Sequence, residues 1–231
     1  MTKDDLPVVE IRVRTDSIDR YTAIFQTGVT LVTPGTVSIG VFLDKLPGFT
    51  MDYINNRVQT IFLNGSAMDD LETPLIGTHP VLALSAAMPG LAGAIFRRNS
   101  MHAALRSANV QHPMPSGQPK TIAVTLKLFN MIAAEKGADI LAQGVGFTGA
   151  QLTDFFADHP TLVTSITHAF LTGQALDRDE LMQQLDRLGD IRLIIRKSVH
   201  SGNTTSGIAT RSCRDNTQHS TGKLNKIVTN H

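Results

Sequence analysis

The segment with the clearest potential for binding chemistry is MPGLAGAIFRR, residues 88–98, where small residues precede two adjacent arginines. Gly90 and Gly93 would let a ligand approach the backbone closely. If a helix begins here, its free backbone N–H groups would accept an anion, with Arg97 or Arg98 nearby. Gly90, Gly93, Arg97 and Arg98 are therefore the candidate site for a small anionic ligand.

The same segment also has a structural interpretation, which the sequence favours over ligand binding. A glycine turn would lead into an amphipathic helix whose Leu91, Ile95 and Met101 or Leu105 pack on the preceding domain. In that case the glycines form a turn and bind no ligand. Anion binding that is unchanged after replacement of both arginines would support this second interpretation.

Other residue types that carry chemistry do not form a recognisable catalytic or metal site. Asp69, Asp70 and Glu72 could bind a hard cation, but acidic residues in a turn after Asn-Gly are usually solvated. No Gly-x-Ser-x-Gly motif and no phosphate-loop motif is present. We predict no catalytic residue, no metal and no cofactor, and the sequence favours a protein that is not an enzyme. The histidines considered, none at metal-ligand spacing, are His79, His102, His112, His159 and His168.

Composition limits the class of protein. The chain has 231 residues, of which 42% are hydrophobic and 18% charged, which fits two globular domains of about 100 residues each. A net charge of +1 provides no strong field for nucleic acid. The N-terminus lacks the apolar stretch of a signal peptide, and no apolar run reaches the roughly 18 residues of a membrane span. We expect a cytoplasmic protein that binds neither nucleic acid nor membrane. The single Cys213 excludes an internal disulfide.

The elements expected in the first half follow the order strand, strand, helix, strand, strand. Residues 8–15 alternate apolar and polar side chains, and residues 28–35 do so again after a turn, which predicts a hairpin. Residues 38–46 change to helical spacing and stop at Pro47-Gly48. Two further strands are expected at 58–65 and 80–88, with a polar turn between them.

The second half repeats this order. Residues 121–130 are rich in β-branched side chains, and residues 138–149 supply a partner strand after a turn at Gly137. A helix is expected at 150–160. The last two strands are expected at 165–173 and 190–197, separated by a turn and a short helical piece.

Corresponding positions in the two halves indicate an internal repeat. FLNGSAMDD (62–70) matches FLTGQALDR (170–178), and Gly28-Val29 matches Gly144-Val145. An apolar strand that ends in a tight turn needs residues such as Asn64-Gly65 or Thr172-Gly173, which accept backbone conformations that others resist. The alternative is that any two strand-turn segments look alike, but the shared element order favours a repeat.

On these residues the chain resembles the ubiquitin-like β-grasp proteins, and most closely the small sulfur carriers of molybdopterin and thiamine synthesis. The matching stretches are FLNGSAMDDLETPL with the following VLAL, and THAFLTGQALD with DIRLII. The resemblance implies an α+β fold of two tandem β-grasp domains, each a mixed sheet packed on one helix. It also implies a protein partner.

The chain departs from that family at the point where carriers do their chemistry. A sulfur carrier ends in Gly-Gly, whose terminal carboxylate is adenylated and thiolated. Here the first copy runs through MPGLAG into AIFRR, and the second through SVHSG into a long tail. Carrier chemistry would therefore need cleavage after Gly93 or Gly202, for which the sequence offers no support.

The expected organisation is a first β-grasp domain with a trailing helix at 1–107, a linker at 108–119, a second β-grasp domain at 120–197 and a disordered tail at 198–231. The linker is predicted from its prolines and the tail from its Ser, Thr, Asn and Gly content. The preferred function is a non-catalytic protein-interaction module without the terminal Gly-Gly. The alternative is a small-anion-binding or enzyme-accessory protein that uses the interdomain cleft or the Gly90–Arg98 loop.

Overall fold

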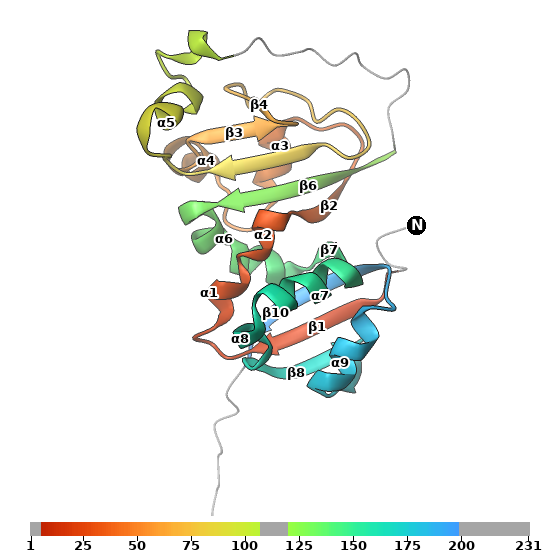
Figure 1. The fold of residues 1–231 in the computed structure, drawn as a ribbon. Helices are drawn as coiled ribbons and strands as arrows, with labels where there is room; N and C mark the ends of the chain where they lie inside the picture. The colour runs from red at the N-terminus through yellow and green to blue at the C-terminus, as the bar shows by residue number, and fades with distance from the viewer. Residues whose placement is uncertain (1–5, 107–119, 199–231) are drawn as a thin grey trace, which may run out of the picture. The chain divides into compact units, whose positions relative to one another are not determined.

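Strands and helices together form an α+β fold in the part of the chain that the computed structural model describes, residues 6–106 and 120–198 (Figure 1). The predicted α+β class is therefore confirmed. The strands are β1 (Val8–Val13), β2 (Val29–Pro34), β3 (Thr60–Leu63), β4 (Ser66–Ala67), β5 (Val81–Ser85), β6 (Thr121–Phe129), β7 (Val145–Thr148), β8 (Ile166–Leu171), β9 (Gln174–Leu176) and β10 (Asp190–Lys197). The helices are α1 (Ile18–Tyr21), α2 (Ile24–Thr27), α3 (Ile39–Asp44), α4 (Met51–Arg57), α5 (Gly90–Phe96), the 3-10 helix η1 (Ala103–Leu105), α6 (Asn130–Gln143), α7 (Gly149–Asp158), α8 (Pro160–Val163) and α9 (Arg178–Leu185).

The ten strands form one mixed sheet in the order β4-β3-β5-β6-β2-β7-β10-β1-β8-β9. A single residue pair, Thr30 with Gly146, joins β2 to β7. This junction divides the sheet into a first half-sheet, β4-β3-β5-β6-β2, and a second half-sheet, β7-β10-β1-β8-β9. Each half-sheet has a central parallel pair, β5 with β6 or β10 with β1, flanked by antiparallel strands. The two half-sheets thus share one pattern of strand directions.

The predicted hairpin of residues 8–15 with 28–35 is wrong. Ile11 of β1 pairs with Ile195 of β10 and with Ala169 of β8, whereas Leu31 of β2 pairs with Val124 of β6. The physical reason is the connection, because two short helices with buried apolar side chains, α1 and α2, replace the expected turn. Such a connection carries β2 away from β1 and into the other half-sheet.

The predicted pairing of residues 121–130 with 138–149 is wrong for a similar reason. Gly137 does not form a turn but lies inside α6, the longest of the described helices. A Cβ at Gly137 would lie 2.8 Å from Cγ2 of Thr22, so the absent side chain allows α6 to pack closely on the α1–α2 segment. β6 therefore pairs with β2 and β5, and β7 pairs with β10.

Strand pairing consequently crosses the predicted boundary at 108–119. β1 belongs to the second half-sheet and β6 to the first, so each half-sheet takes one strand from the other half of the sequence. The described residues belong to one contact unit. The predicted linker lies outside the described residues, and so does the predicted tail apart from Ser198, whose N–H donates to Val13 O over 2.7 Å.

The hairpin turns of the predicted repeat are confirmed. Asn64 and Gly65 have φ values of 50° and 82°, and Thr172 and Gly173 have 48° and 85°. Phe62 pairs with Ala67 across the first turn, and its counterpart Phe170 pairs with Ala175 across the second. Two-residue turns with two positive φ angles match the twist of a β-hairpin, which explains why the sequence repeats here.

Gly28 and Gly144 are equivalent as well. Each ends a helix, α2 or α6, with a positive φ of 107° or 94°, and each is followed by a valine that begins a strand. The expected helices at 38–46 and 150–160 are confirmed as α3 and α7, and the strands at 58–65, 80–88, 165–173 and 190–197 contain β3, β5, β8 and β10. The sequence did not predict α4.

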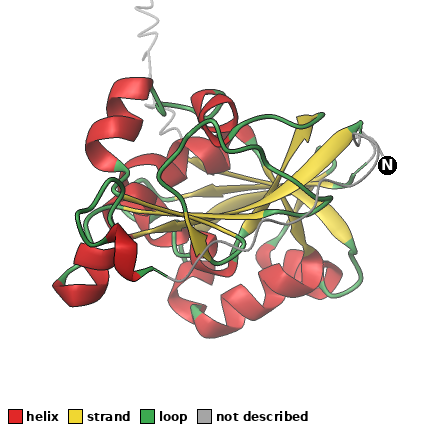
Figure 2. Ribbon diagram, turned by 90° about the horizontal axis from the view of Figure 1, so that it is seen from above, coloured by secondary structure: helices red, strands yellow, loops and turns green. Residues whose placement is uncertain are grey.

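Helices lie on both sides of the strands when the molecule is viewed from above (Figure 2). The buried apolar side chains of the two half-sheets form one continuous hydrophobic cluster. Tyr21 of α1 is fully buried in it, donates to Leu162 O over 2.7 Å, and packs edge-on against Phe156. These contacts anchor the segment that leads from β1 to β2 on α7 and α8.

Candidate functional site

The four predicted site residues lie in one segment that follows β5. Gly90, with φ of 76°, begins α5, and Gly93 is buried in its middle. A Cβ at Gly93 would overlap the carbonyl oxygen of Met88, so this position requires glycine for packing. Arg97 ends the helix and is exposed, whereas Arg98 is partly buried. The helix predicted to begin at this glycine-rich stretch is therefore present, but it is short.

The side chain of Arg98 holds the segment against the first half-sheet. Its Nη1 donates to the carbonyl oxygens of Ile54 and Val58, at 3.2 and 3.3 Å, and its Nε donates to Asp69 O at 3.4 Å. Burial lowers the pKa of this guanidinium, an effect that the charge of Asp69 opposes. The carbonyls of Ile54 and Val58 lie at the end of α4, where helical carbonyls lack partners. Arg98 is therefore committed to structural hydrogen bonds.

Asp69 provides a second attachment. Its Oδ2 accepts from Nη1 of Arg106 at 2.7 Å, and its Oδ1 accepts from the backbone N–H of Asn99 at 2.9 Å. The Arg106 side chain is 11% exposed and also donates from Nε to Ile95 O at 2.9 Å. The acidic stretch that could have bound a cation thus contributes one carboxylate to packing. Among the described residues, no three His, Cys, Asp or Glu side chains are grouped to hold a metal ion.

A polar cavity of about 420 Å³ opens beside the two arginines. Gln59 lines this cavity, and its Oε1 is buried and has no hydrogen-bond partner among the described residues. The cavity combines amide groups with the Arg97 guanidinium, which can bind carboxylates, small anions or the polar backbone of a peptide. The lining residues are Asn55, Val58, Gln59, Arg97, Arg98 and Asn99. Sequence reasoning found the arginines but missed the amides, because Asn55 comes from α4 and Gln59 from the residue just before β3.

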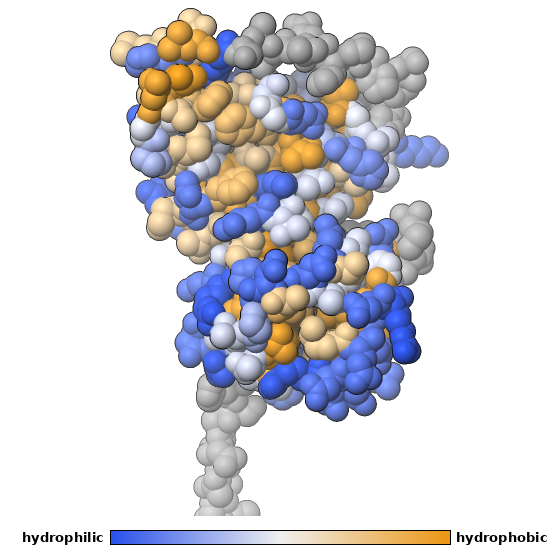
Figure 3. All heavy atoms as spheres, in the orientation of Figure 1, coloured by the Kyte–Doolittle hydropathy of each residue, from blue (hydrophilic) through white to orange (hydrophobic). Residues whose placement is uncertain are grey.

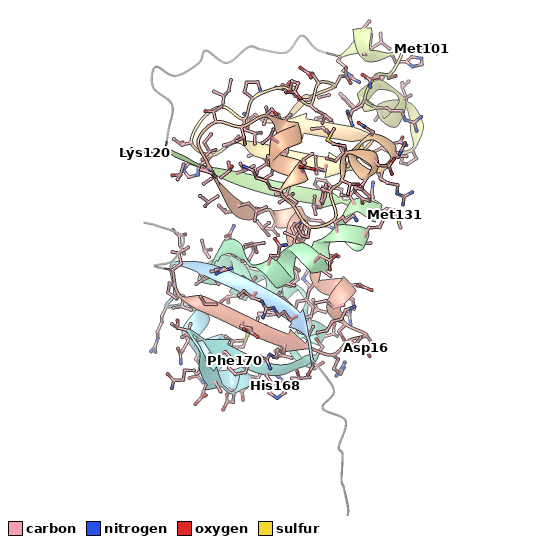
Figure 4. All side chains as sticks on the ribbon, turned by 180° about the vertical axis from the view of Figure 1, so that it is seen from behind. Asp16, Met101, Lys120, Met131, His168 and Phe170 are labelled. Atoms are coloured by element: carbon pink, nitrogen blue, oxygen red, sulfur yellow. The ribbon has the colours of Figure 1, made fainter. Side chains whose placement is uncertain are left out.

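Three large apolar side chains of this segment point into solvent. Leu91 is 71% exposed, Met101 95% and Leu105 66%. We call these three residues the α5 surface. Figure 3 shows hydrophobic residues gathered over α5 and its surroundings, and Figure 4 places Met101 at the upper edge of the view. The prediction that these side chains pack on the preceding domain is therefore wrong, while Ile95 is half-buried.

The α5 surface is held by packing beneath it. The ring of Phe96 lies 5.3 Å from the ring of Phe62 on β3. Ser100 Oγ donates to Ala94 O over 2.5 Å, and Arg98 N donates to Gln59 O over 2.7 Å. The exposed apolar side chains thus belong to a segment with several attachments to the first half-sheet.

A second cavity, of about 290 Å³, lies between α2 and α7. Its charged groups are the carboxylates of Asp154 and Asp158, with His159 beside them. The His159 ring stacks on Phe155 at 4.6 Å, and its Nδ1 donates to Phe155 O at 2.9 Å. Acidic walls repel an anion, so this cavity does not suit the small anionic ligand expected for a cleft.

The remaining histidines named above do not converge on either cavity. His79 and His102 lie in the first half of the chain and His168 on β8, while His112 lies outside the described residues.

None of the described helices has the length and apolar character needed to cross a membrane. Comparisons of this chain with protein-family models, with curated proteins and with solved structures find no significant match.

Proposed function

We propose that the chain is a non-catalytic protein-interaction module built from two β-grasp-like half-sheets. In support, each half-sheet has a central parallel pair with antiparallel strands on both sides and a short hairpin strand at one end. This strand pattern resembles that of ubiquitin-like domains. Each half-sheet contains one strand from the other half of the sequence, and we call this arrangement the strand exchange. Because of it, the two half-sheets are parts of one interaction unit.

The observation that carries the proposal is the α5 surface. Large exposed apolar groups on one segment mark surfaces that bind other proteins, because their burial by a partner releases apolar area from water. Arg98 and the Asp69–Arg106 ion pair fix the segment before a partner arrives. A surface that is already ordered loses less conformational entropy on binding.

Sulfur-carrier chemistry does not form part of the proposal. Gly93 is packed against Met88 inside α5, and residues beyond it return to the first half-sheet through Arg98 and Arg106. A carrier terminus must instead reach into an enzyme as an extended chain. Gly202 lies outside the described residues.

One observation favours a second candidate function, the binding of a small anion in the polar cavity. Arg97 is exposed there and lies beside amide groups that donate hydrogen bonds. A ligand in this cavity would stabilise the fold by about 2.7 kcal/mol at a hundredfold excess over its dissociation constant. If inorganic phosphate, sulfate and citrate all fail to raise the melting temperature, this candidate function is ruled out.

Native mass spectrometry of the full chain, purified gently from its own cells, tests the proposal. The expected result is a full-length chain in a stoichiometric complex with another protein. The triple variant L91S/M101S/L105S should lose that partner and keep its fold, because these side chains are exposed. The matched control is Met131→Ser, since Met131 is 52% exposed on α6 and should leave the complex intact.

Three other results would contradict the proposal. A chain ending at Gly93 or Gly202 with one sulfur added would restore carrier chemistry. A full-length chain with a bound small molecule and no protein would favour the second candidate. A complex that survives the triple variant would show that the partner binds elsewhere.

A further inference from the structure

The uncovered face of the second half-sheet carries a row of basic side chains. Arg12 of β1 pairs in register with Arg196 of β10 on one side and with His168 of β8 on the other. All three are exposed. Neighbouring strands lie about 4.8 Å apart, so the row is about 10 Å wide. We call these three residues the basic row.

The basic row lies on the face opposite α7 and α8, and the end of α6 borders the row at Arg196. Figure 1 shows α7 and α8 in front of the second half-sheet, and Figure 4, turned by 180°, shows the uncovered strands with His168 and Phe170. Side chains alternate along a strand, so Val9 and Ile11 face the helices and are buried, while Arg12 faces outward. The row is thus accessible.

The charges of the row are only partly compensated within the molecule. Arg12 Nε donates to Glu10 Oε1 at 3.0 Å, and no described residue accepts from its terminal nitrogens. Arg196 donates from Nε and Nη2 to Ala142 O near the end of α6, and forms no ion pair with a described residue. Each guanidinium therefore keeps donors for a ligand.

Two arginines directly opposite each other on a sheet repel, which costs stability. Glu10 on β1 offsets the charge of Arg12. Asp190 lies on the same side of β10 as Arg196, but at the other end of that strand. A ligand carboxylate between the two guanidiniums would remove the repulsion and form charge-assisted hydrogen bonds, bidentate where geometry permits. The complementary ligand is acidic.

Phe170 distinguishes an acidic protein segment from a nucleic acid. Its ring lies beneath Arg12, whose Cζ is 5.0 Å from the ring centroid. Single-stranded nucleic acids bind sheets by stacking bases on exposed aromatic faces, and here the guanidinium covers that face. The rim of the half-buried ring stays available for an apolar side chain. A short acidic stretch with one apolar residue fits both features.

The chain itself has no suitable occupant. Residues 107–119 contain no acidic residue, and residues 199–231 contain only Asp215 among four Lys and Arg. Asp4 and Asp5 come eight and seven residues before Arg12 in the sequence, and only two residues separate them from the start of β1. None of these stretches supplies an acidic segment that suits the row, and we therefore look for the ligand in another molecule.

We propose that the basic row and Phe170 form a docking surface for an acidic segment of a partner protein. This inference is separate from the α5 surface and does not depend on it. A bound segment would place a carboxylate between Arg12 and Arg196, and an apolar side chain against Phe170. Binding would weaken as salt is raised, because the charges are exposed.

The test uses the full ¹⁵N-labelled chain and an end-blocked peptide of sequence Gly-Glu-Glu-Leu-Glu-Glu-Gly. Amide shifts should move in β1, β8 and β10, and a peptide with Gln in place of every Glu should bind at least about tenfold more weakly. The R12E/R196E variant should abolish these shifts. R12Q/R196Q provides the same test with a smaller perturbation if the double charge reversal does not fold.

Arg187→Glu is the matched control, since Arg187 is an exposed arginine between α9 and β10, and it should bind the Glu peptide as the unmodified chain does. Binding that persists in R12Q/R196Q, or shifts confined to other elements, would overturn the proposal. Tighter binding of a uridine oligonucleotide than of the peptide at this face would overturn it in favour of nucleic acid.

Discussion

Ile11 of β1 lies beside Ile195 of β10 in a parallel pair, although the two strands stand at opposite ends of the described chain. Both side chains are fully buried. The pair closes the second half-sheet, just as β6 closes the first by lying between β5 and β2. Neither half of the sequence therefore contains all the strands of one half-sheet.

Each half of the chain needs a strand from the other half to complete its half-sheet. A fragment of residues 1–107 lacks β6, so β5 loses one neighbour and β2 loses both, and we expect it not to fold alone. A specific protease site introduced into residues 108–119 and then cut should leave two pieces that co-elute on size exclusion and unfold together. Cooperative thermal unfolding of the isolated 1–107 fragment, followed by circular dichroism, would contradict the strand exchange.

Gly93→Ala tests the packing of α5 on Met88. The added methyl group would overlap the Met88 carbonyl, and we expect a loss of about 2–3 kcal/mol in the free energy of unfolding by urea. Gly189→Ala is the control, because no heavy atom lies within 4 Å of a Cβ at that position, and it should change stability by less than about 0.5 kcal/mol. Equal effects at the two positions would refute the packing argument.

The two adjacent arginines should behave differently. Arg98→Ala removes donors to three backbone carbonyls and should destabilise the fold by about 1–3 kcal/mol, measured by denaturant unfolding. Arg97→Ala removes an exposed side chain and should be nearly neutral, within about 0.5 kcal/mol. If Arg97→Ala proved the more damaging, the structural role assigned to Arg98 would fail.

Tyrosine titration gives an optical test of burial. The chain has two tyrosines and no tryptophan, so tyrosinate absorbance reports these groups alone. Burial raises the pKa of Tyr21, and burial followed by a hydrogen bond to Glu135 raises the pKa of Tyr53. Both tyrosines of the folded chain should titrate above pH 10, and in denaturant their pKa should return to the ordinary value of about 10. Stability should be retained below about pH 10 and fall as pH rises further. Titration of the folded chain near pH 10 would contradict both shifts.

Glu135 links α6 to α4 and makes stability depend on acid. Hydrogen bonds from Arg57 and then from Tyr53, which donates to Oε2 at 2.8 Å, lower the pKa of this carboxyl. Its stabilising effect is present above the unfolded value of about 4.3 and disappears as pH falls through the lower folded value. Because the pair is partly exposed, the effect should be small and salt-sensitive.

Urea unfolding at several pH values measures this effect. Glu135→Gln should be less stable than the unmodified chain at pH 7, and the difference should shrink at acid pH. Asp52→Asn on α4 is the control, since its carboxylate contacts only Asn56 among the described side chains. A difference for Glu135→Gln that does not change with pH would exclude the ion pair as its cause.

The sequence by itself determined the local features of this protein. The Asn64-Gly65 and Thr172-Gly173 turns, the correspondence of Gly28 with Gly144, most of the strands, and the helices α3 and α7 could be predicted, because each depends on the backbone preferences and spacing of nearby residues. The α+β class was implied by the family resemblance that these residues carry. The sequence identified Gly93 and Arg98 as candidate residues. It does not show that backbone carbonyl oxygens from elsewhere in the chain contact both of them.

Only the tertiary structure decided which strands pair. β1 alternates apolar and polar residues and would fit beside β2 as well as beside β10, because a strand's pattern specifies a buried face and not a partner. The choice depends on the buried α1–α2 connection and on the close packing of Gly137 against Thr22, which are contacts between residues far apart in the chain. The same long-range packing leaves Leu91, Met101 and Leu105 exposed and aligns Arg196, Arg12 and His168 in one row.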